Sequence, residues 1–113
     1  MLGRAEQRDG TFVVIEMIQD ADVTTLREFG DELRRRAGSA AIILGSVLDG
    51  KLSYVVMLTD DLVQRGWDAA KIGREMGKAV GGGGGGRTDV ATGGGKPERA
   101  QAGFAKAREA LPV

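Results

Sequence analysis

The sequence predicts an α/β domain in which a small mixed β-sheet of about four strands packs against three main helices, in the order β-α-β-β-α-β-α. Short apolar runs of strand length alternate with segments whose apolar residues recur every three or four positions. An Asp-Gly pair separates two of the apolar runs, as in a tight hairpin. The 113 residues, 42% of them hydrophobic, are sufficient for a single domain with its own core.

The first predicted unit is a strand followed by a helix. The strand is the apolar, β-branched run from Thr11 to Ile18. Asp20 and Asp22 are candidate N-caps for the helix, and Gly38 is its expected terminator. The residues that form one apolar stripe along this helix, at spacings of three and four, are Leu26, Phe29, Leu33 and Ala37.

Two further strands are predicted to form a hairpin. The apolar runs 40–47 and 52–58 flank Asp49-Gly50, which is a two-residue turn signal. A right-handed helical crossover makes the first two strands parallel, and the hairpin makes the third antiparallel to the second. Because both runs are almost continuously apolar, we expect them to be buried on both faces.

The second and third helices lie in the C-terminal half. Asp68 is the expected cap of a helix that reaches Val80, and Gly73 and Gly77 lie one turn apart on it. Each glycine costs about 1 kcal/mol relative to alanine in a helix, so the pair indicates close packing onto the sheet. The last helix opens at Lys96-Pro97-Glu98, where proline suits the first position.

Glycine is concentrated in one region, because nine of the 19 glycines lie between residues 81 and 95. One interpretation of Gly81–Gly86 is a flexible linker. The other is a loop whose backbone closely approaches a phosphate, a nucleoside or the neighbouring sheet. The run does not fit a P-loop. A P-loop follows a strand and continues with Gly-Lys and Ser or Thr, whereas this run follows a helix and is followed by Arg87-Thr88. A short fourth strand is expected beside it, around 88–91.

Missing residue types exclude several kinds of chemistry. The chain has no cysteine and no histidine, and therefore has no disulfide, no thiolate nucleophile and no imidazole base or metal ligand. Asp60-Asp61 lies at an expected helix start, where acidic caps belong. We predict no catalytic residue and no metal ligand. The polar N-terminus and the lack of an apolar run of about 18 residues predict a cytoplasmic chain without a membrane partner.

Charge is balanced overall but unevenly distributed. Sixteen basic residues match sixteen acidic ones. Residues 74–113 carry seven basic and four acidic groups, a net charge of +3, whereas residues 1–36 carry six and eight, a net charge of −2. We therefore expect an anionic partner to contact the C-terminal third.

The glycine region contains the candidate contacts for an anionic partner. Arg87 can clamp a phosphate or stack on a base; the alternative is an ion pair with Asp89. Asp89 is expected to order the loop by accepting backbone N–H bonds. Flanking residues are candidate phosphate ligands, with solvated surface charges as the alternative: Lys78, Lys96 and Arg99.

Two aromatic residues and one basic cluster are secondary candidates. Tyr54 lies within an apolar strand, where core packing is the favoured interpretation. Trp67 lies between two helical turns and suits either the core or base stacking. The cluster Arg34–Arg36 follows Asp31 and Glu32, and is interpreted as a solvated helix end.

The run VGGGGGGRTDVATGG, residues 80–94, closely resembles the pattern G-G-x-G-G-G-R-P-D-M-A-Q-A-G-G of the DHH-associated (C-Ala) domain of alanyl-tRNA synthetases. The resemblance extends from about Thr11 to Leu111 and includes the Leu26-Arg27 pair. This chain departs from the pattern where the family has proline, methionine and Gln-Ala, at Thr88, Val90 and Thr92-Gly93. Val90 is expected in the core, and Thr92 removes any glutamine-specific contact.

Residues 1–10 are polar and are expected to form an N-terminal lead-in, and the resemblance implies a single nucleic-acid-binding domain over residues 11–113. It implies contact with the elbow of alanine tRNA in support of aminoacylation and editing. Four glycines join the basic candidates as binding residues: Gly83, Gly84, Gly85 and Gly86. No catalytic activity or cofactor is expected in this fragment, because ATP, Mg and Zn would belong to missing parent domains. An upstream helical segment would allow a homo-oligomer.

Two alternatives belong to other functional classes. The chain would be the substrate-binding domain of a DHH-type phosphoesterase, although the related glycine motif there contains a histidine that this chain lacks. It would otherwise be an oligomerisation module that uses the edge of its sparsely charged strands.

Overall fold

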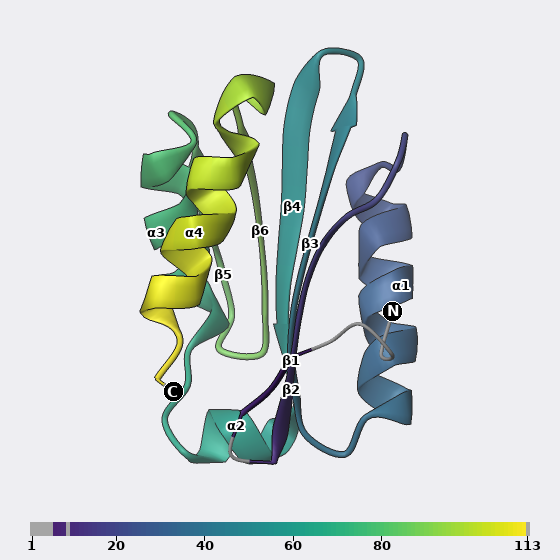
Figure 1. Ribbon diagram of the computed structural model, residues 1–113, viewed down its shortest axis with the longest axis vertical. Helices are drawn as coiled ribbons and strands as arrows, with labels where there is room; N and C mark the ends of the chain where they lie inside the picture. Colours follow the sequence, from purple (N-terminus) through teal and green to yellow (C-terminus); the bar gives the residue numbers. More distant parts are fainter. Residues whose placement is uncertain (1–5, 9, 113) are drawn as a thin grey trace.

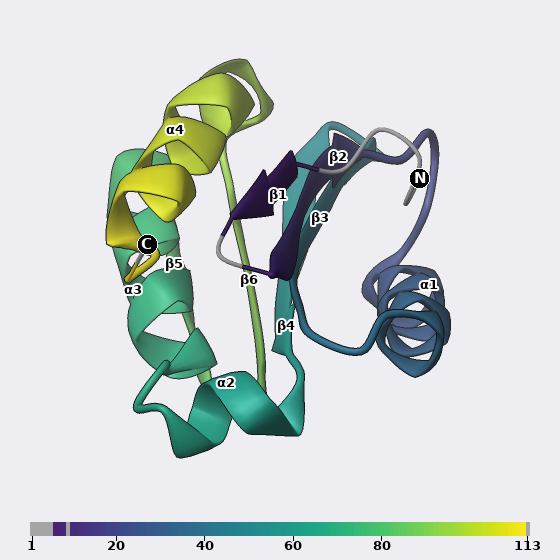
Figure 2. The same cartoon turned by 60° about the horizontal axis from the view of Figure 1, so that its bottom comes forward.

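One mixed sheet runs through the middle of the molecule and carries helices on both faces (Figures 1 and 2). A computed structural model describes residues 6–8 and 10–112. The strands follow the order β1-β2-β3-β4-β6-β5 across the sheet. The elements in chain order are β1 (Glu6–Arg8), β2 (Thr11–Met17), α1 (Val23–Arg36), β3 (Ala40–Leu48), β4 (Lys51–Leu58), α2 (Asp60–Gln64), α3 (Ala69–Ala79), β5 (Gly83–Gly86), β6 (Val90–Gly95), the 3₁₀ helix η2 (Pro97–Arg99) and α4 (Ala100–Ala110).

The predicted centre of the sheet is confirmed. Strands β2 and β3 are parallel, with Val14 opposite Ile42, and β3 and β4 are antiparallel. The turn between β3 and β4 has φ values of 53° at Asp49 and 73° at Gly50, which suit a two-residue hairpin. Most of β3 and β4 is buried, as expected for strands covered on both faces.

Two hydrophobic cores lie on opposite faces of the sheet. Helix α1 covers one face with Leu26 and Leu33, and its first turn is capped by Asp22, whose Oδ1 accepts a 2.8 Å hydrogen bond from Thr25 N. Helices α3 and α4 cover the other face and pack Ile72 and Phe104 against it. Figure 2 shows α1 on one side of the sheet, with α3 and α4 on the other.

The predicted strand count of about four is wrong, because the sheet has six strands among the described residues. Strand β1 lies in the predicted lead-in and pairs with the start of β2. The glycine run forms the edge strand β5 instead of a loop, and β6 occupies Val90–Gly95 rather than the expected 88–91. Glycine gives no sequence signal for a strand, because β-propensity reflects how side chains pack.

No helix in the described part of the chain is both long enough and apolar enough to cross a membrane.

Candidate nucleic-acid interface

Helix α3 packs directly on the backbone of the glycine strand. A Cβ atom added to Gly77 would lie 2.8 Å from Gly83 C and Gly84 N, and one added to Gly73 would lie 3.1 Å from Ala91 Cβ. The expected close packing of Gly73 and Gly77 is therefore confirmed. The glycines of β5 meet a helix on this face, so this face of the strand is not available to a ligand.

Tyr54 explains two more glycines of the hairpin formed by β5 and β6. Its hydroxyl donates a 2.6 Å hydrogen bond to the carbonyl oxygen of Gly73. Cβ atoms at Gly84 or Gly93 would collide with that hydroxyl. Tyr54 is fully buried, which confirms the core interpretation, and burial raises the pKa of its phenol to about 12.

The other face of the β5–β6 hairpin is open. Cβ atoms added to Gly83 or Gly85 would meet no atom within 4 Å. Thr92 lies opposite Gly85 in the strand register and therefore on the same face. Helix α1 packs on β3 and β4, so it leaves this part of the sheet exposed. A hollow of about 260 Å³ lies here, lined by Arg27, Gly85, Gly86, Arg87, Val90 and Thr92.

Arg87 lies in the turn between β5 and β6, where its side chain is 72% exposed. Its Nε lies 3.5 Å from Asp89 Oδ1, so the ion pair considered as the alternative to a phosphate contact is present. An ion pair this exposed contributes little to stability. The side chain of Asp89 pairs with Arg87 and, at 3.9 Å, with Arg34, so the expected role in accepting backbone N–H bonds is wrong.

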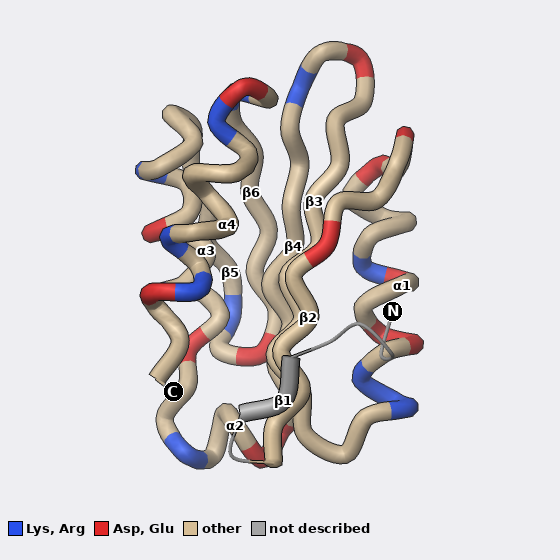
Figure 3. The backbone as a smooth tube through the Cα atoms, viewed as in Figure 1, with Lys and Arg blue, Asp and Glu red and all other residues tan. Residues whose placement is uncertain are grey.

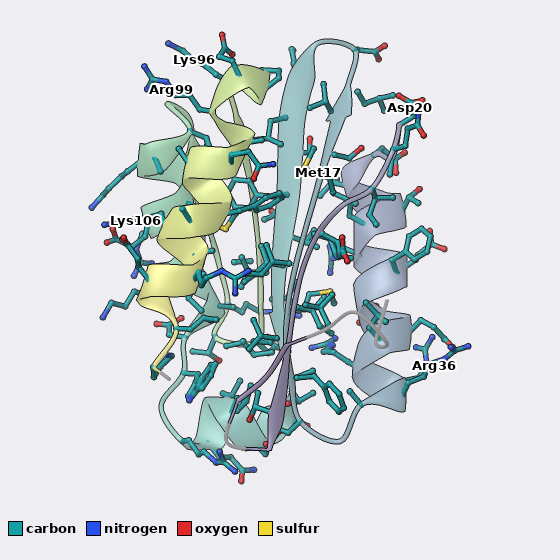
Figure 4. The ribbon with its side chains drawn as sticks, in the orientation of Figure 1. Met17, Asp20, Arg36, Lys96, Arg99 and Lys106 are labelled. Atoms are coloured by element: carbon teal, nitrogen blue, oxygen red, sulfur yellow. The ribbon has the colours of Figure 1, made fainter. Side chains whose placement is uncertain are left out.

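The other three basic residues contact Gly81, at the opposite end of the hairpin, with Lys78 doing so through its backbone. A Cβ atom on Gly81 would lie 3.3 Å from Arg99 Nη1 and 3.4 Å from Lys96 Cδ. The carbonyl oxygen of Lys78 accepts a 3.4 Å hydrogen bond from Gly81 N. The side-chain Nζ of Lys78 lies 3.8 Å from Glu75 Oε1. Figure 4 shows Lys96 and Arg99 pointing away from the sheet at this end.

The predicted basic residues therefore do not form one patch. Figure 3 shows basic segments at both ends of the β5–β6 hairpin, with the glycine strands between them. Arg87 lies only nine residues before Lys96 in the sequence. Strand β6 runs between them, so the two residues lie at opposite ends of an extended strand.

The secondary candidates are integrated into the fold. Trp67 is 5% exposed and packs in the core beneath α3 and α4, so the base-stacking interpretation is wrong. Arg35 and Arg36 pair with Glu32 at 2.6 and 3.1 Å, as expected of a solvated helix end. Asp60 and Asp61 begin α2, as predicted. Val90 is buried, also as expected.

Arg27 is not among the residues that the sequence predicts to contact nucleic acid. It is exposed on α1 and lines the same hollow as Arg87. Helical periodicity shows that position 27 lies off the apolar stripe, but it does not show which strand the side chain faces. The one sequence feature that sets Arg27 apart from the other exposed residues of α1 is that the Leu26-Arg27 pair belongs to the family resemblance.

The model of the DHHA1 domain family matches residues 10–112. The chain is 38% identical over 112 residues to the alanine–tRNA ligase of Alkaliphilus oremlandii, covering 98% of this chain and 13% of that protein. It is 43% identical over 96 residues to the ligase of Acetivibrio thermocellus, covering 85% of this chain and 11% of that protein. The chain thus spans a small part of the length of these relatives.

The crystal structure of the C-Ala domain from Aquifex aeolicus alanyl-tRNA synthetase matches this fold with a TM-score of 0.86. The two sequences are 27% identical, and the match covers 97% of this chain and 99% of that domain. The family model, the relatives and the structure agree with the resemblance seen in the glycine region. This chain therefore belongs to the DHHA1 domain family, as a domain of the C-Ala type.

Proposed function

We propose that this chain is the tRNA-binding C-terminal domain of an alanine–tRNA ligase in the cytoplasm. The proposal rests on family membership together with one structural observation: the β5–β6 hairpin carries exposed cations at both ends and an open, glycine-rich face between them. Phosphate contacts supply most of the sequence-independent affinity of proteins for nucleic acids. The hairpin is thus suited to follow an RNA backbone.

In this proposal the chain binds the elbow of alanine tRNA and helps the aminoacylation and editing centres of the parent protein to act on the same tRNA. The catalytic groups, ATP, Mg and Zn would belong to the parent domains outside this chain. An upstream helical segment would mediate any homo-oligomerisation. The candidate contacts are those at the hairpin: Arg87, Lys78, Lys96, Arg99 and the glycines of β5, Gly83, Gly84, Gly85 and Gly86.

The binding mode would depend on RNA shape and backbone. Tyr54 and Trp67 are buried, so neither ring is free to stack on a base. The exposed groups at the hairpin include guanidinium, ammonium and backbone groups, which contact phosphate and ribose rather than distinguish bases. Such a domain recognises where a folded tRNA places its backbone, as the elbow does.

The test compares two RNAs with the isolated chain. Dissociation constants for full-length alanine tRNA and for an acceptor-stem minihelix are measured at two salt concentrations. Salt-dependent binding of the full tRNA, with much weaker binding of the minihelix, is expected for elbow recognition. Equal binding of both RNAs would indicate nonspecific phosphate attraction, and no binding of either would refute the proposal.

A matched variant controls for loss of positive charge. Lys106 lies on the outer surface of α4, away from the hairpin (Figure 4), where its Nζ is 3.6 Å from Glu109 Oε2. Lys106→Ala removes the same charge as Lys96→Ala. Only the second substitution is expected to weaken tRNA binding.

A further inference from the structure

We propose that the hollow between α1 and the β5–β6 hairpin binds the sugar–phosphate backbone of RNA, with Arg27 and Arg87 holding a phosphate and Thr92 contacting a ribose. This inference rests on the proposed function and assigns its contact surface. Arg27 and Thr92 then join the binding residues, and the corner formed by Lys96 and Arg99 is secondary. The hollow has a volume of about 260 Å³ and is bounded by two arginines from separate elements.

The charge of the hollow favours an anion. Two arginines line it, and no aspartate or glutamate does. Arg27 forms no ion pair with any carboxylate in the described part of the chain, whereas Arg34, Arg35 and Arg36 of the same helix are all paired. A guanidinium without a carboxylate partner keeps its full set of donors for a bidentate phosphate contact.

The opposite wall of the hollow is almost bare backbone. Gly85 has open space above its Cα, and Gly86 continues the wall toward Arg87. The Thr92 hydroxyl has no hydrogen-bond partner among residues 6–8 and 10–112 and lies on the same face as Gly85. A ribose can therefore approach the strand closely and exchange a hydrogen bond between its 2′-hydroxyl and Thr92.

The lining also distinguishes a backbone site from a base site. No aromatic residue lines the hollow, so a base would lack a stacking partner of the kind found in single-strand binding proteins. Arginine, threonine and exposed peptide groups match phosphate and ribose, which every nucleotide of the tRNA presents.

Three substitutions test the hollow without disturbing the core. Gly85→Leu fills it, and the open space at Gly85 leaves room for the new side chain. Arg27→Gln removes one charge, and Thr92→Val removes the hydroxyl while keeping the shape. One control is matched to them: Arg36→Gln removes a charge from the same helix at a position outside the lining. Thermal unfolding confirms that each variant is folded.

Affinity for alanine tRNA is measured over a salt series. Gly85→Leu is expected to weaken binding about tenfold or more, because it blocks close approach of the backbone. Arg27→Gln is expected to weaken binding and to reduce the slope of log affinity against log salt by about 1. Thr92→Val should weaken binding of the tRNA but not of an all-DNA analogue, which lacks the 2′-hydroxyl. The control Arg36→Gln should bind like the wild-type chain.

The failures are distinguishable. If the wild-type chain binds tRNA and Gly85→Leu and Arg27→Gln bind equally well, the hollow is not the contact, although the proposed function stands. If the wild-type chain does not bind tRNA, the proposed function itself fails. If Arg27→Gln abolishes binding of inorganic phosphate but leaves the affinity for tRNA unchanged, the hollow is a site for a free anion, and the backbone proposal is overturned.

Discussion

The hydroxyl of Tyr54 in β4 donates a 2.6 Å hydrogen bond to the carbonyl oxygen of Gly73 in α3, across the strands β6 and β5. This bond exists because Gly84 and Gly93 have no side chains, so the tyrosine can extend beneath the helix. The glycines of the hairpin thus serve the core on one face and leave the other face bare. The glycines of β5 and β6 therefore allow close packing of the core on one face and add no side chain to the other face.

The bond itself is predicted to stabilise the fold. Tyr54→Phe keeps the ring and removes the donor, and it should lower the free energy of unfolding by about 1 kcal/mol. Urea denaturation measures this change. Unchanged stability would mean that the Gly73 carbonyl gains nothing from the phenol. The variant should bind tRNA like the wild-type chain, because Tyr54 is buried away from the open face.

The chain contains a single tyrosine, so its ionisation can be followed directly. Burial raises the pKa of Tyr54 to about 12, whereas the unfolded value is about 10. The folded chain therefore holds this proton more tightly. The resulting stabilisation is complete below pH of about 10 and is lost as the pH rises through about 12. Ultraviolet absorbance of tyrosinate should show this late titration, and a midpoint near 10 in the folded chain would contradict it.

The two faces of β5 predict opposite effects of alanine. Gly84→Ala places a methyl group against the Tyr54 hydroxyl and 2.7 Å from Gly73 O, and should destabilise the fold by about 1–3 kcal/mol. Gly83→Ala lies in open space and should be neutral or stabilise by about 0.4–1 kcal/mol through the unfolded state. Thermal unfolding of the two variants compares them directly. Equal destabilisation would show that the strand tolerates no side chain on either face.

The family pattern has alanine at the position of Gly93, where this chain has room only for glycine. Gly93→Ala should destabilise the wild-type fold because its Cβ meets the Tyr54 ring. The penalty should shrink in a Tyr54→Val background, giving a coupling energy of about 0.5–3 kcal/mol in a double-mutant cycle. Part of the penalty should remain, because Gly83 O lies 2.6 Å from the same point. Additive effects would show that the two positions do not constrain each other.

Because Arg87 and Lys96 lie at opposite ends of the β5–β6 hairpin, their substitutions should lower tRNA affinity to different extents. Arg87→Ala removes a guanidinium that is 72% exposed beside the open face, and it should lower tRNA affinity severalfold and reduce the salt slope by about 1. Lys96→Ala, at the other end of the hairpin, should have a smaller effect. Binding titrations over a salt series separate the two. An unchanged affinity in Arg87→Ala would remove this residue from the interface.

Much of the central fold could be predicted from sequence because local chemistry specifies it. Continuous apolar runs identified β2, β3 and β4, and Asp49-Gly50 identified the hairpin. Aspartate caps marked the starts of α1 and α3, and the Asp68 carboxylate accepts a 2.9 Å bond from Ala70 N as expected. The glycine region and its arginine were recognised as the candidate site, because that composition is rare in a packed domain.

Tertiary structure alone decided what the glycines do and which cations meet. A glycine strand has no alternation of apolar and polar side chains, so only its pairing with β6 identifies β5 as a strand. Arg27 and Arg87 lie 60 positions apart in the chain and line one hollow because α1 packs on the face of the sheet on which the β5–β6 hairpin is open. Sequence patterns report local periodicity and composition, whereas that meeting depends on long-range packing.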